Sequence, residues 1–215
     1  MAKRIFISKN ESEVQELKAH YQKQNYTLIA HSFLQFEQVD FTIQHNYDVL
    51  FFSSPRSVLF FKARYELQSN KLVACTGSKT KQLLESLGVV VSFSGVNTSK
   101  INAVAEDFKS WLGDNNVLFP LSDISKKTIS SLIDDAQKQE IIVYKTEIQP
   151  KKIALCDTYI FTSPSNVKGF LIANEIPTNG ELISWGESTS AELRKYGVNE
   201  LSELKNSSLS ELYES

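Results

Sequence analysis

One pattern occurs twice in this chain, 109 positions apart and without a gap. The stretch 48–55 corresponds to the stretch 157–164, and the register holds onward to Gly88 and Gly197. Thirteen of the 42 positions from 48 to 89 are identical to their partners, whereas unrelated sequences of ordinary composition would share about two or three. We interpret this as an internal duplication. Two similar halves predict a two-lobed protein with a ligand cleft between matching helix ends.

The composition is that of a globular protein. Of the 215 residues, 41% are hydrophobic and 11% are aromatic, which is enough to fill the core of one large or two small domains. The net charge of −2 favours neither nucleic acid nor an anionic membrane as a partner. No apolar run approaches the roughly 20 residues of a membrane span, and the opening apolar segment is too short for a signal peptide. We therefore expect a cytoplasmic protein.

Several common kinds of site find no support in the sequence. There is no Gly-rich dinucleotide loop, no Walker A loop and no G-x-S-x-G elbow, which argues against dinucleotide, NTP and hydrolase functions. The three histidines form no i, i+4 pair and have no cysteine at metal-ligand spacing, so we expect no metal site. Cys75 and Cys156 are too few for a disulfide framework, and we interpret them as inert apolar residues.

Short apolar strands alternate with amphipathic helices along the chain. Ser54 is predicted to cap a helix that has Pro55 at its first position, and Gly88 and Gly197 are predicted to end helices. This alternation predicts an α/β fold with parallel strands joined by right-handed crossovers. The predicted strands are 4–8, 26–30, 48–52, 72–75, 157–161 and 182–184, and the predicted helices are 11–24, 78–87, 164–173 and 188–196, with another starting at Ser54-Pro55.

The duplication extends beyond the gap-free stretch. Strands at 5–7 and 26–29 bracket one helix, as strands at 117–119 and 140–143 bracket another, and the acidic pair Asp134-Asp135 falls on that second predicted helix. Each half therefore reads β-α-β, a connector, then β-α-β-α. The connectors show no Gly/Ser-rich composition, so we expect structured crossings. The residues alone leave open whether the lobes are contiguous or one is interrupted.

Small hydroxyl residues gather where predicted strands end and helices begin. Free N–H groups and the helix dipole make such turns anion sites, and hydroxyls add donors. Any single one is explained by helix capping, but four turns at duplicated positions favour a ligand with several carboxylates or phosphates. In an open α/β sheet this edge is also where ligands bind. The residues are Ser53, Ser54, Thr162, Ser163 and Ser165 in the first pair of turns, and Thr76, Ser78, Thr80, Ser184, Ser188 and Thr189 in the second.

Four stretches in this order resemble the uroporphyrinogen-III synthase family. Their order, which covers essentially the whole chain, is more specific than any one of them. They are Phe51-Phe52-Ser53-Ser54-Pro55-Arg56-Ser57-Val58, Val143-Tyr144-Lys145-Thr146, Ile160-Phe161-Thr162-Ser163-Pro164-Ser165-Asn166-Val167 and Trp185-Gly186-Glu187-Ser188-Thr189-Ser190-Ala191-Glu192-Leu193.

The resemblance decides the lobe arrangement that the residues left open. It implies two similar lobes with parallel sheets flanked by helices, joined by a two-stranded crossing, with one lobe discontinuous. We expect 1–30 and 149–215 to form the discontinuous α/β lobe and 37–143 the inserted α/β lobe. Residues 31–36 and 144–148 are then the strands between the lobes.

The resemblance also implies a reaction, in which hydroxymethylbilane is cyclised to uroporphyrinogen III with loss of water and inversion of the last pyrrole ring. It implies no metal or organic cofactor. The substrate carries eight carboxylates, which suits the anion sites inferred above. Tyr144 matches the Tyr of the family's Val-Tyr-x-Thr stretch, where it would face the cleft and donate a proton to the leaving hydroxyl; the alternative is an aromatic wedge that steadies the crossing strand.

The expected substrate-binding residues are Lys9, Ser53, Ser54, Ser78, Thr80, Thr162, Ser163, Ser165, Asn166, Ser188 and Thr189. Thr189 matches the second hydroxyl of the family's Gly-Pro-Thr-Thr turn, which here lacks its proline. Where many relatives carry Arg after the first strand and after the strand 117–119, this chain has Lys9 and Lys126. These lysines either replace the arginines as carboxylate binders or are ordinary surface residues.

One alternative function of another class stays open, a non-catalytic bilobal protein that binds a tetrapyrrole or another anionic metabolite. The lack of a signal peptide and of an added output segment favours a stand-alone biosynthetic enzyme, a lyase. We expect a monomer whose partner is the small-molecule substrate, with no nucleic acid or membrane partner.

Overall fold

The structure is a computed structural model that describes residues 2–95, 101–206 and 208–213. The predicted lobes also include residues 1, 96–100, 207 and 214–215, which lie outside this described part. The chain divides into two compact units. Unit 1 comprises Met1–Gln35 and Glu147–Ser215, and unit 2 comprises Phe36–Thr146. Among the described helices, none is both long enough and apolar enough to cross a bilayer.

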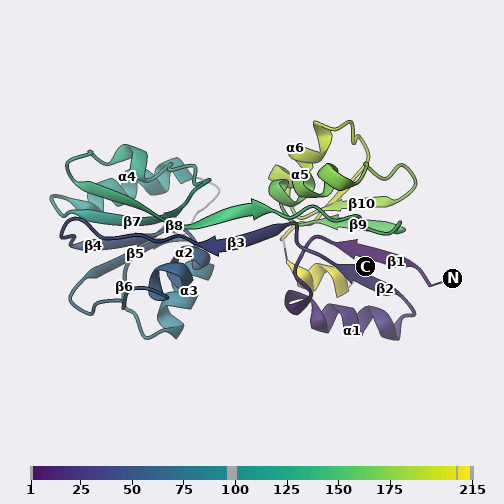
Figure 1. Cartoon of the computed structure of the whole chain (residues 1–215), viewed down its shortest axis with the longest axis horizontal. Coiled ribbons are helices and arrows are strands. Elements are labelled where there is room, and N and C mark those ends of the chain that lie inside the picture. Colours follow the sequence, from purple (N-terminus) through teal and green to yellow (C-terminus); the bar gives the residue numbers. More distant parts are fainter. Residues whose placement is uncertain (1, 96–100, 207, 214–215) are drawn as a thin grey trace. The chain divides into compact units, whose positions relative to one another are not determined.

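Unit 1 is a parallel sheet with helices on both faces (Figure 1). The strand order is β11-β10-β9-β1-β2, and every neighbouring pair is parallel. Side chains alternate between two cores because successive residues of a strand point to opposite faces. Phe6 and Phe161 pack with helices α5 and α6, and Ile5 and Ile7 pack with α1 and η4. The elements are β1 Arg4–Ile7, η1 Glu11–Glu13, α1 Gln15–Lys23, β2 Thr27–Ala30, β9 Thr158–Phe161, α5 Pro164–Ala173, β10 Glu181–Ser184, α6 Glu187–Arg194, β11 Ser202–Glu203 and η4 Leu209–Tyr213.

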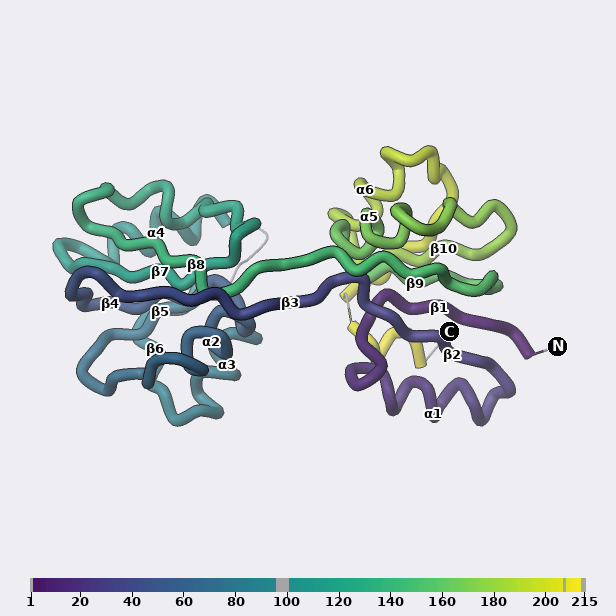
Figure 2. The backbone as a smooth tube through the Cα atoms, viewed as in Figure 1, coloured from purple at the N-terminus to yellow at the C-terminus, as the bar shows by residue number. Residues whose placement is uncertain are grey.

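Unit 2 is built in the same way around a sheet of order β3-β8-β7-β4-β5-β6 (Figure 2). Its strands from β8 to β6 are parallel. Strand β4 is buried throughout, with Phe52 on the face of α2 and α3 and Phe51 on the face of α4. The elements are β3 Leu34–Gln38, β4 Val49–Phe52, α2 Pro55–Lys62, β5 Leu72–Thr76, α3 Ser78–Ser86, β6 Val91–Gly95, α4 Ile101–Leu112, β7 Val117–Ser122, η3 Ser130–Leu132 and β8 Lys138–Ile148. The division between the units falls within β3 and near the end of β8.

The two sheets repeat one order of strands. The run β10-β9-β1-β2 in unit 1 corresponds to β5-β4-β7-β8 in unit 2, and each strand takes the place of the one that the duplicated sequence pairs it with. The predicted α/β class with parallel sheets and flanking helices is confirmed. The duplication therefore makes two open parallel sheets, whose carboxyl edges are where ligands bind in such folds.

The predicted helix starts at two duplicated turns are confirmed. Ser54 and Ser163 are both extended N-caps, and each Oγ accepts a hydrogen bond from the backbone N–H three residues on, at 3.2 Å in both cases. Pro55 and Pro164 fill the first helical position, where the missing N–H costs nothing. Gly88 follows α3 with φ of 78°, a left-handed conformation that suits glycine at a helix end.

The helix predicted between 117–119 and 140–143 is wrong. The described chain there holds one turn of 3₁₀ helix, η3, and Asp134 and Asp135 lie beyond it in irregular chain. Hydroxyl side chains compete with helical hydrogen bonding in this segment, as Ser131 Oγ donates to the Thr128 carbonyl and Ser130 Oγ donates to the Glu140 carboxylate. The sequence reading also missed β6 and α4.

Candidate functional site

In unit 2, the first hydroxyl turn lies at the carboxyl end of β4. Ser54 Oγ accepts from Ser57 N, so its lone pairs serve the helix while its proton stays available to a ligand. Ser53 is exposed and makes no side-chain hydrogen bond within the described chain. It lines a pocket of about 320 Å³ at this edge of the sheet. The geometry therefore leaves two hydroxyl donors free at the start of α2.

The second turn of unit 2 follows β5. Helix α3 begins after Gly77, whose φ of 79° lies in the left-handed region, so a glycine takes the cap position here. Ser78 then occupies the first helical position and is exposed, whereas Thr80 is buried at 2% exposure. Of these two predicted residues, the exposed Ser78 is the accessible one.

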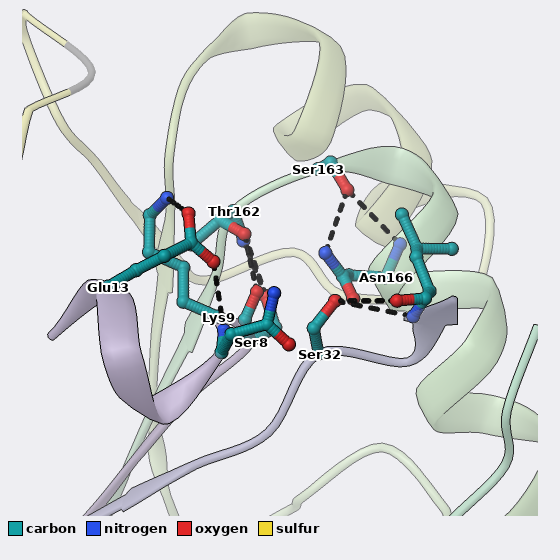
Figure 3. Close-up of polar contacts among 9 residues, drawn as sticks. Ser8, Lys9, Glu13, Ser32, Thr162, Ser163 and Asn166 are labelled. Atoms are coloured by element: carbon teal, nitrogen blue, oxygen red, sulfur yellow. Dashed lines mark hydrogen bonds and ion pairs between the residues drawn. The ribbon is translucent and has the colours of Figure 1, made fainter. Parts of the chain in front are cut away.

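In unit 1, the corresponding edge of the sheet holds a closed polar network (Figure 3). Ser8 Oγ accepts from the backbone N–H of Thr162 at 2.7 Å, and Thr162 Oγ1 donates to the Ser8 carbonyl at 2.6 Å. Ser8 is fully buried. The N–H and the hydroxyl proton of Thr162 are thus both committed to the fold, which leaves Thr162 a poor anion donor.

Ser163 and Asn166 form a second part of this edge (Figure 3). Ser163 Oγ accepts from the backbone N–H and the side-chain amide of Asn166, at 3.2 and 3.1 Å. Asn166 Oδ1 in turn accepts from Phe33 N at 2.9 Å, so this buried side chain holds the chain after β2 against α5. Ser163 gives no proton in these bonds, which leaves its O–H free to donate.

Lys9 follows this network at the end of β1. Its ammonium pairs with Glu13 at 3.2 Å and lies 5.3 Å from the centre of the Trp185 ring. The paired carboxylate lowers the net positive charge that an anionic ligand would meet. A ligand carboxylate must therefore compete with Glu13 for Lys9.

The remaining predicted residues of unit 1 differ in access. Ser165 in the first turn of α5 is partly exposed, and Ser188 in the first turn of α6 is exposed. Thr189 is 2% exposed and donates its backbone N–H to the Gly186 carbonyl at 2.9 Å. The Ser188 hydroxyl is thus open to solvent where the Thr189 side chain is buried.

Tyr144 lies on β8 in an aromatic cluster of unit 2. Its ring stacks on Phe60 with centroids 5.0 Å apart and meets the edge of Phe36 at 6.0 Å. Only 6% of the residue is exposed, so part of its role is packing, and no described hydrogen bond uses its hydroxyl. The Arg56 guanidinium lies 3.4 Å from the Phe36 ring centre and 6.0 Å from that of Tyr144.

Arg56 is the cation that the sequence reading left out of the site. It belongs to the first turn of α2, next to Ser54 and Pro55, and makes no ion pair within the described chain. An exposed, unpaired guanidinium beside a tyrosine and a capped helix start suits a carboxylate ligand. The Ser-Pro-Arg sequence could have indicated this role, because a basic residue in the first turn of a helix is unfavourable for the helix dipole.

Cysteine chemistry and metal binding have little support. Burial raises the pKa of both thiols, that of Cys156 to about 11, so neither is the thiolate that reacts at neutral pH. No group of three or more His, Cys, Asp or Glu side chains within the described ranges could hold a metal ion. What the described chain does offer is hydroxyl, amide and cationic donors at the carboxyl edges of two sheets.

The sequence matches the model of the family described as uroporphyrinogen-III synthase HemD over residues 15–214. The chain belongs to the uroporphyrinogen-III synthase family. This is a family of lyases. The resemblance to it that the four stretches of sequence suggested is confirmed. No curated protein matches the sequence.

Two solved structures of uroporphyrinogen-III synthases share the fold. The enzyme of Helicobacter pylori 26695 is 18% identical with a TM-score of 0.71, and the match covers 100% of this chain and 97% of that one. A mutant enzyme of the extremely thermophilic bacterium Thermus thermophilus is 13% identical with a TM-score of 0.62, over 96% and 94% of the two chains. At these identities, the two structures establish the shared fold and not the roles of individual side chains.

Proposed function

We propose that the chain cyclises hydroxymethylbilane to uroporphyrinogen III, with loss of water and inversion of the last pyrrole ring. The observation that carries the proposal is the match to the synthase family over 15–214. The duplicated helix starts support it, because a substrate with many carboxylates needs many donors, and the N–H and hydroxyl groups at these starts supply them.

The reaction begins at the hydroxymethyl group. Its carbon–oxygen bond breaks, a proton joins the leaving oxygen, and water departs from a cationic azafulvene. The last pyrrole ring attacks that cation through its substituted carbon, and the spiro intermediate then opens and recloses with the ring inverted. Loss of a ring proton restores aromaticity, so the proton taken from the protein is returned and one water is released.

Tyr144 is the proposed proton donor. Stacking on Phe60 fixes its ring, so its hydroxyl is held in one direction, and a positioned phenol can donate to the departing oxygen and recover the proton at the end. Arg56 is proposed to hold a substrate carboxylate beside it. Packing of Tyr144 in the core of unit 2 agrees equally with the wedge role. The variants Tyr144→Phe and Tyr144→Ala distinguish the two roles.

The substrate carboxylates are proposed to bind at the starts of four helices. Ser53, Ser54 and Ser78 serve in unit 2, and Ser163, Ser165 and Ser188 serve in unit 1, with backbone N–H groups as further donors. Asn166 is proposed to support Ser163. Lys9, Thr80, Thr162 and Thr189 are proposed to keep the edges in shape, since each is paired or buried. We further propose that the enzyme is monomeric and cytoplasmic.

Genetic complementation tests the proposed function. Expressed in a bacterial strain that lacks its own uroporphyrinogen-III synthase, the chain should restore growth without added haem. A non-catalytic tetrapyrrole-binding protein would bind the intermediates but leave the strain dependent on haem. Absence of rescue, with the chain present and folded in the cells, would contradict the proposed function.

A further inference from the structure

The pocket beside Ser53 lies wholly within unit 2, at the carboxyl ends of β4, β5 and β7. Its volume of about 320 Å³ is at the lower end for small-molecule sites. It has an apolar side, which includes Phe51, Phe119 and Ile129, and a polar rim of hydroxyl and lysine side chains. Such a pocket is large enough for one substituted ring of a tetrapyrrole but not for the whole molecule.

Thr76 on the wall of this pocket carries an unsatisfied hydroxyl. The residue is 8% exposed, and its Oγ1 is buried with no hydrogen-bond partner among the described residues. A buried hydroxyl without a partner destabilises a fold. A ligand oxygen that reached this hydroxyl would therefore gain a hydrogen bond, and no existing hydrogen bond would have to break.

The two lysines on the rim differ in their partners. Lys127 donates to the Glu140 carboxylate at 2.5 Å, and Ser130 Oγ donates to the other oxygen of the same carboxylate. Lys126 is exposed and makes no ion pair within the described chain. The charge of Lys127 is thus used within the fold, while that of Lys126 is free for an anion.

The duplication provides an internal comparison. In unit 1 the position that corresponds to Thr76 is Trp185, a side chain that Lys9 covers. The partner of Ser53 is Thr162, which is tied to Ser8, whereas the partner of Ser8 in unit 2 is Leu121, which has no hydroxyl. The same edge of the sheet is therefore filled in unit 1 and hollow in unit 2, so the pocket is not a general consequence of the fold.

We infer that this pocket binds one carboxylate-bearing pyrrole ring of the substrate, with the Thr76 hydroxyl and the Lys126 ammonium as its two polar contacts. The identity of the ligand rests on the proposed function, while the site rests on its own geometry. The apolar side accepts the face of the ring, Thr76 donates to one oxygen, and Lys126 supplies the countercharge. Unit 2 would thereby fix one particular ring and so help to set which ring is inverted.

Amide NMR of the intact chain, titrated with porphobilinogen, tests this inference. Porphobilinogen is a monopyrrole with one acetate and one propionate arm, and its affinity should fall in the millimolar range. We expect saturable shifts at Thr76 and Lys126. Thr76→Val should weaken binding about 3- to 10-fold and Thr76→Ser should restore it, because a single hydrogen bond is gained or lost.

Lys126→Gln should also weaken binding about 3- to 10-fold and remove most of its salt dependence. Lys109→Gln, the same change at an exposed lysine on α4 away from the pocket, should bind like the parent. The melting temperature of Thr76→Val should stay level or rise, because the Thr76 hydroxyl makes no hydrogen bond within the described chain that the fold would lose. A hydroxyl with a structural role would instead lower the melting temperature when removed. That readout separates loss of a contact from loss of the fold.

Absence of saturable shifts in the parent would overturn the inference, and so would parent-like affinity in either Thr76→Val or Lys126→Gln. These outcomes are independent of complementation. A chain that binds the monopyrrole through Thr76 and Lys126 but does not rescue growth would keep the pocket and contradict the synthase function. Rescue of growth without monopyrrole binding would keep the synthase function and contradict the pocket.

Discussion

At the scale of single residues, the site depends on which hydrogen-bonding groups the fold already uses. Ser163 and Thr162 are neighbours in sequence, yet the hydroxyl proton of Thr162 is donated to Ser8 and that of Ser163 is free. Residue type and position, which predicted both as ligands, cannot reveal this. The direction of each hydroxyl proton depends on partners that lie far away in the chain.

Ser163→Asp should separate capping from ligand binding. Aspartate caps a helix about as well as serine, so thermal stability should change little, while its charge should repel a ligand carboxylate. Calorimetry should show product binding weakened by at least about 1 kcal/mol. As the matched variant, Thr162→Val should lower stability by about 1 to 2 kcal/mol and leave binding unchanged. Parent-like binding in Ser163→Asp would remove this turn from the site.

Tyr144 offers a second test at this scale. If its phenol protonates the leaving hydroxyl, Tyr144→Phe keeps the stacking on Phe60 but lacks the proton, so turnover should fall about 10- to 1000-fold with little change in stability. Some activity should persist, because hydroxymethylbilane loses its hydroxyl unaided. Initial rates of III-isomer formation provide the measurement.

The wedge role predicts the opposite pair of results. Tyr144→Phe should then be nearly silent, and Tyr144→Ala should lower the free energy of unfolding by about 2 to 4 kcal/mol through lost packing. If Tyr144→Phe forms the III isomer at the parent rate, proton donation by Tyr144 is contradicted, and the shape of the site and its anion binding remain as the mechanism.

At the scale of elements, the sequence predicted what local patterns determine. Apolar runs and Ser-Pro turns act locally, so the sequence predicted the buried strands β4 and β9 and the helix starts at Ser54 and Ser163. The sequence did not predict the structure of the link from β7 to β8. Its shape depends on Glu140 in β8, which binds Lys127 and Ser130, and no periodicity encodes such a contact.

Glu140 should therefore carry the stability of this link. Burial by itself raises the pKa of Glu140, but the hydrogen bonds from Lys127 and Ser130 outweigh it and hold the pKa below its usual value. A carboxylate with a depressed folded pKa stabilises the fold above its unfolded pKa, and this contribution is lost as pH falls through the folded pKa. Glu140→Gln should cost about 1 to 2 kcal/mol at neutral pH.

Chemical denaturation of Glu140→Gln and the parent at several pH values provides the measurement. The difference between them should be full near pH 7 and should shrink as pH falls below the ordinary glutamate range. Lys81→Gln, which removes an exposed pair with Glu85, serves as the control and should cost less than about 0.5 kcal/mol. A Glu140→Gln difference that does not vary with pH would contradict the assigned role.

At the scale of the whole molecule, duplication explains both the fold and the chemistry. One strand order used twice gives two carboxyl edges with matching helix starts, and small changes make the copies unlike: Trp185 against Thr76, and Ser8 against Leu121. Two similar but unequal edges suit a substrate made of four similar rings of which one must be treated differently.

The most direct test of this account is the identity of the product. Hydroxymethylbilane left alone cyclises to the I isomer, so the purified chain should divert it to uroporphyrinogen III, over many turnovers and in the presence of a metal chelator. Chromatography of the oxidised products, at protein concentrations far below that of the substrate, provides the measurement. The account predicts that the III isomer dominates and that its initial rate scales with protein concentration. Only the I isomer, formed at the rate seen without protein, would contradict it.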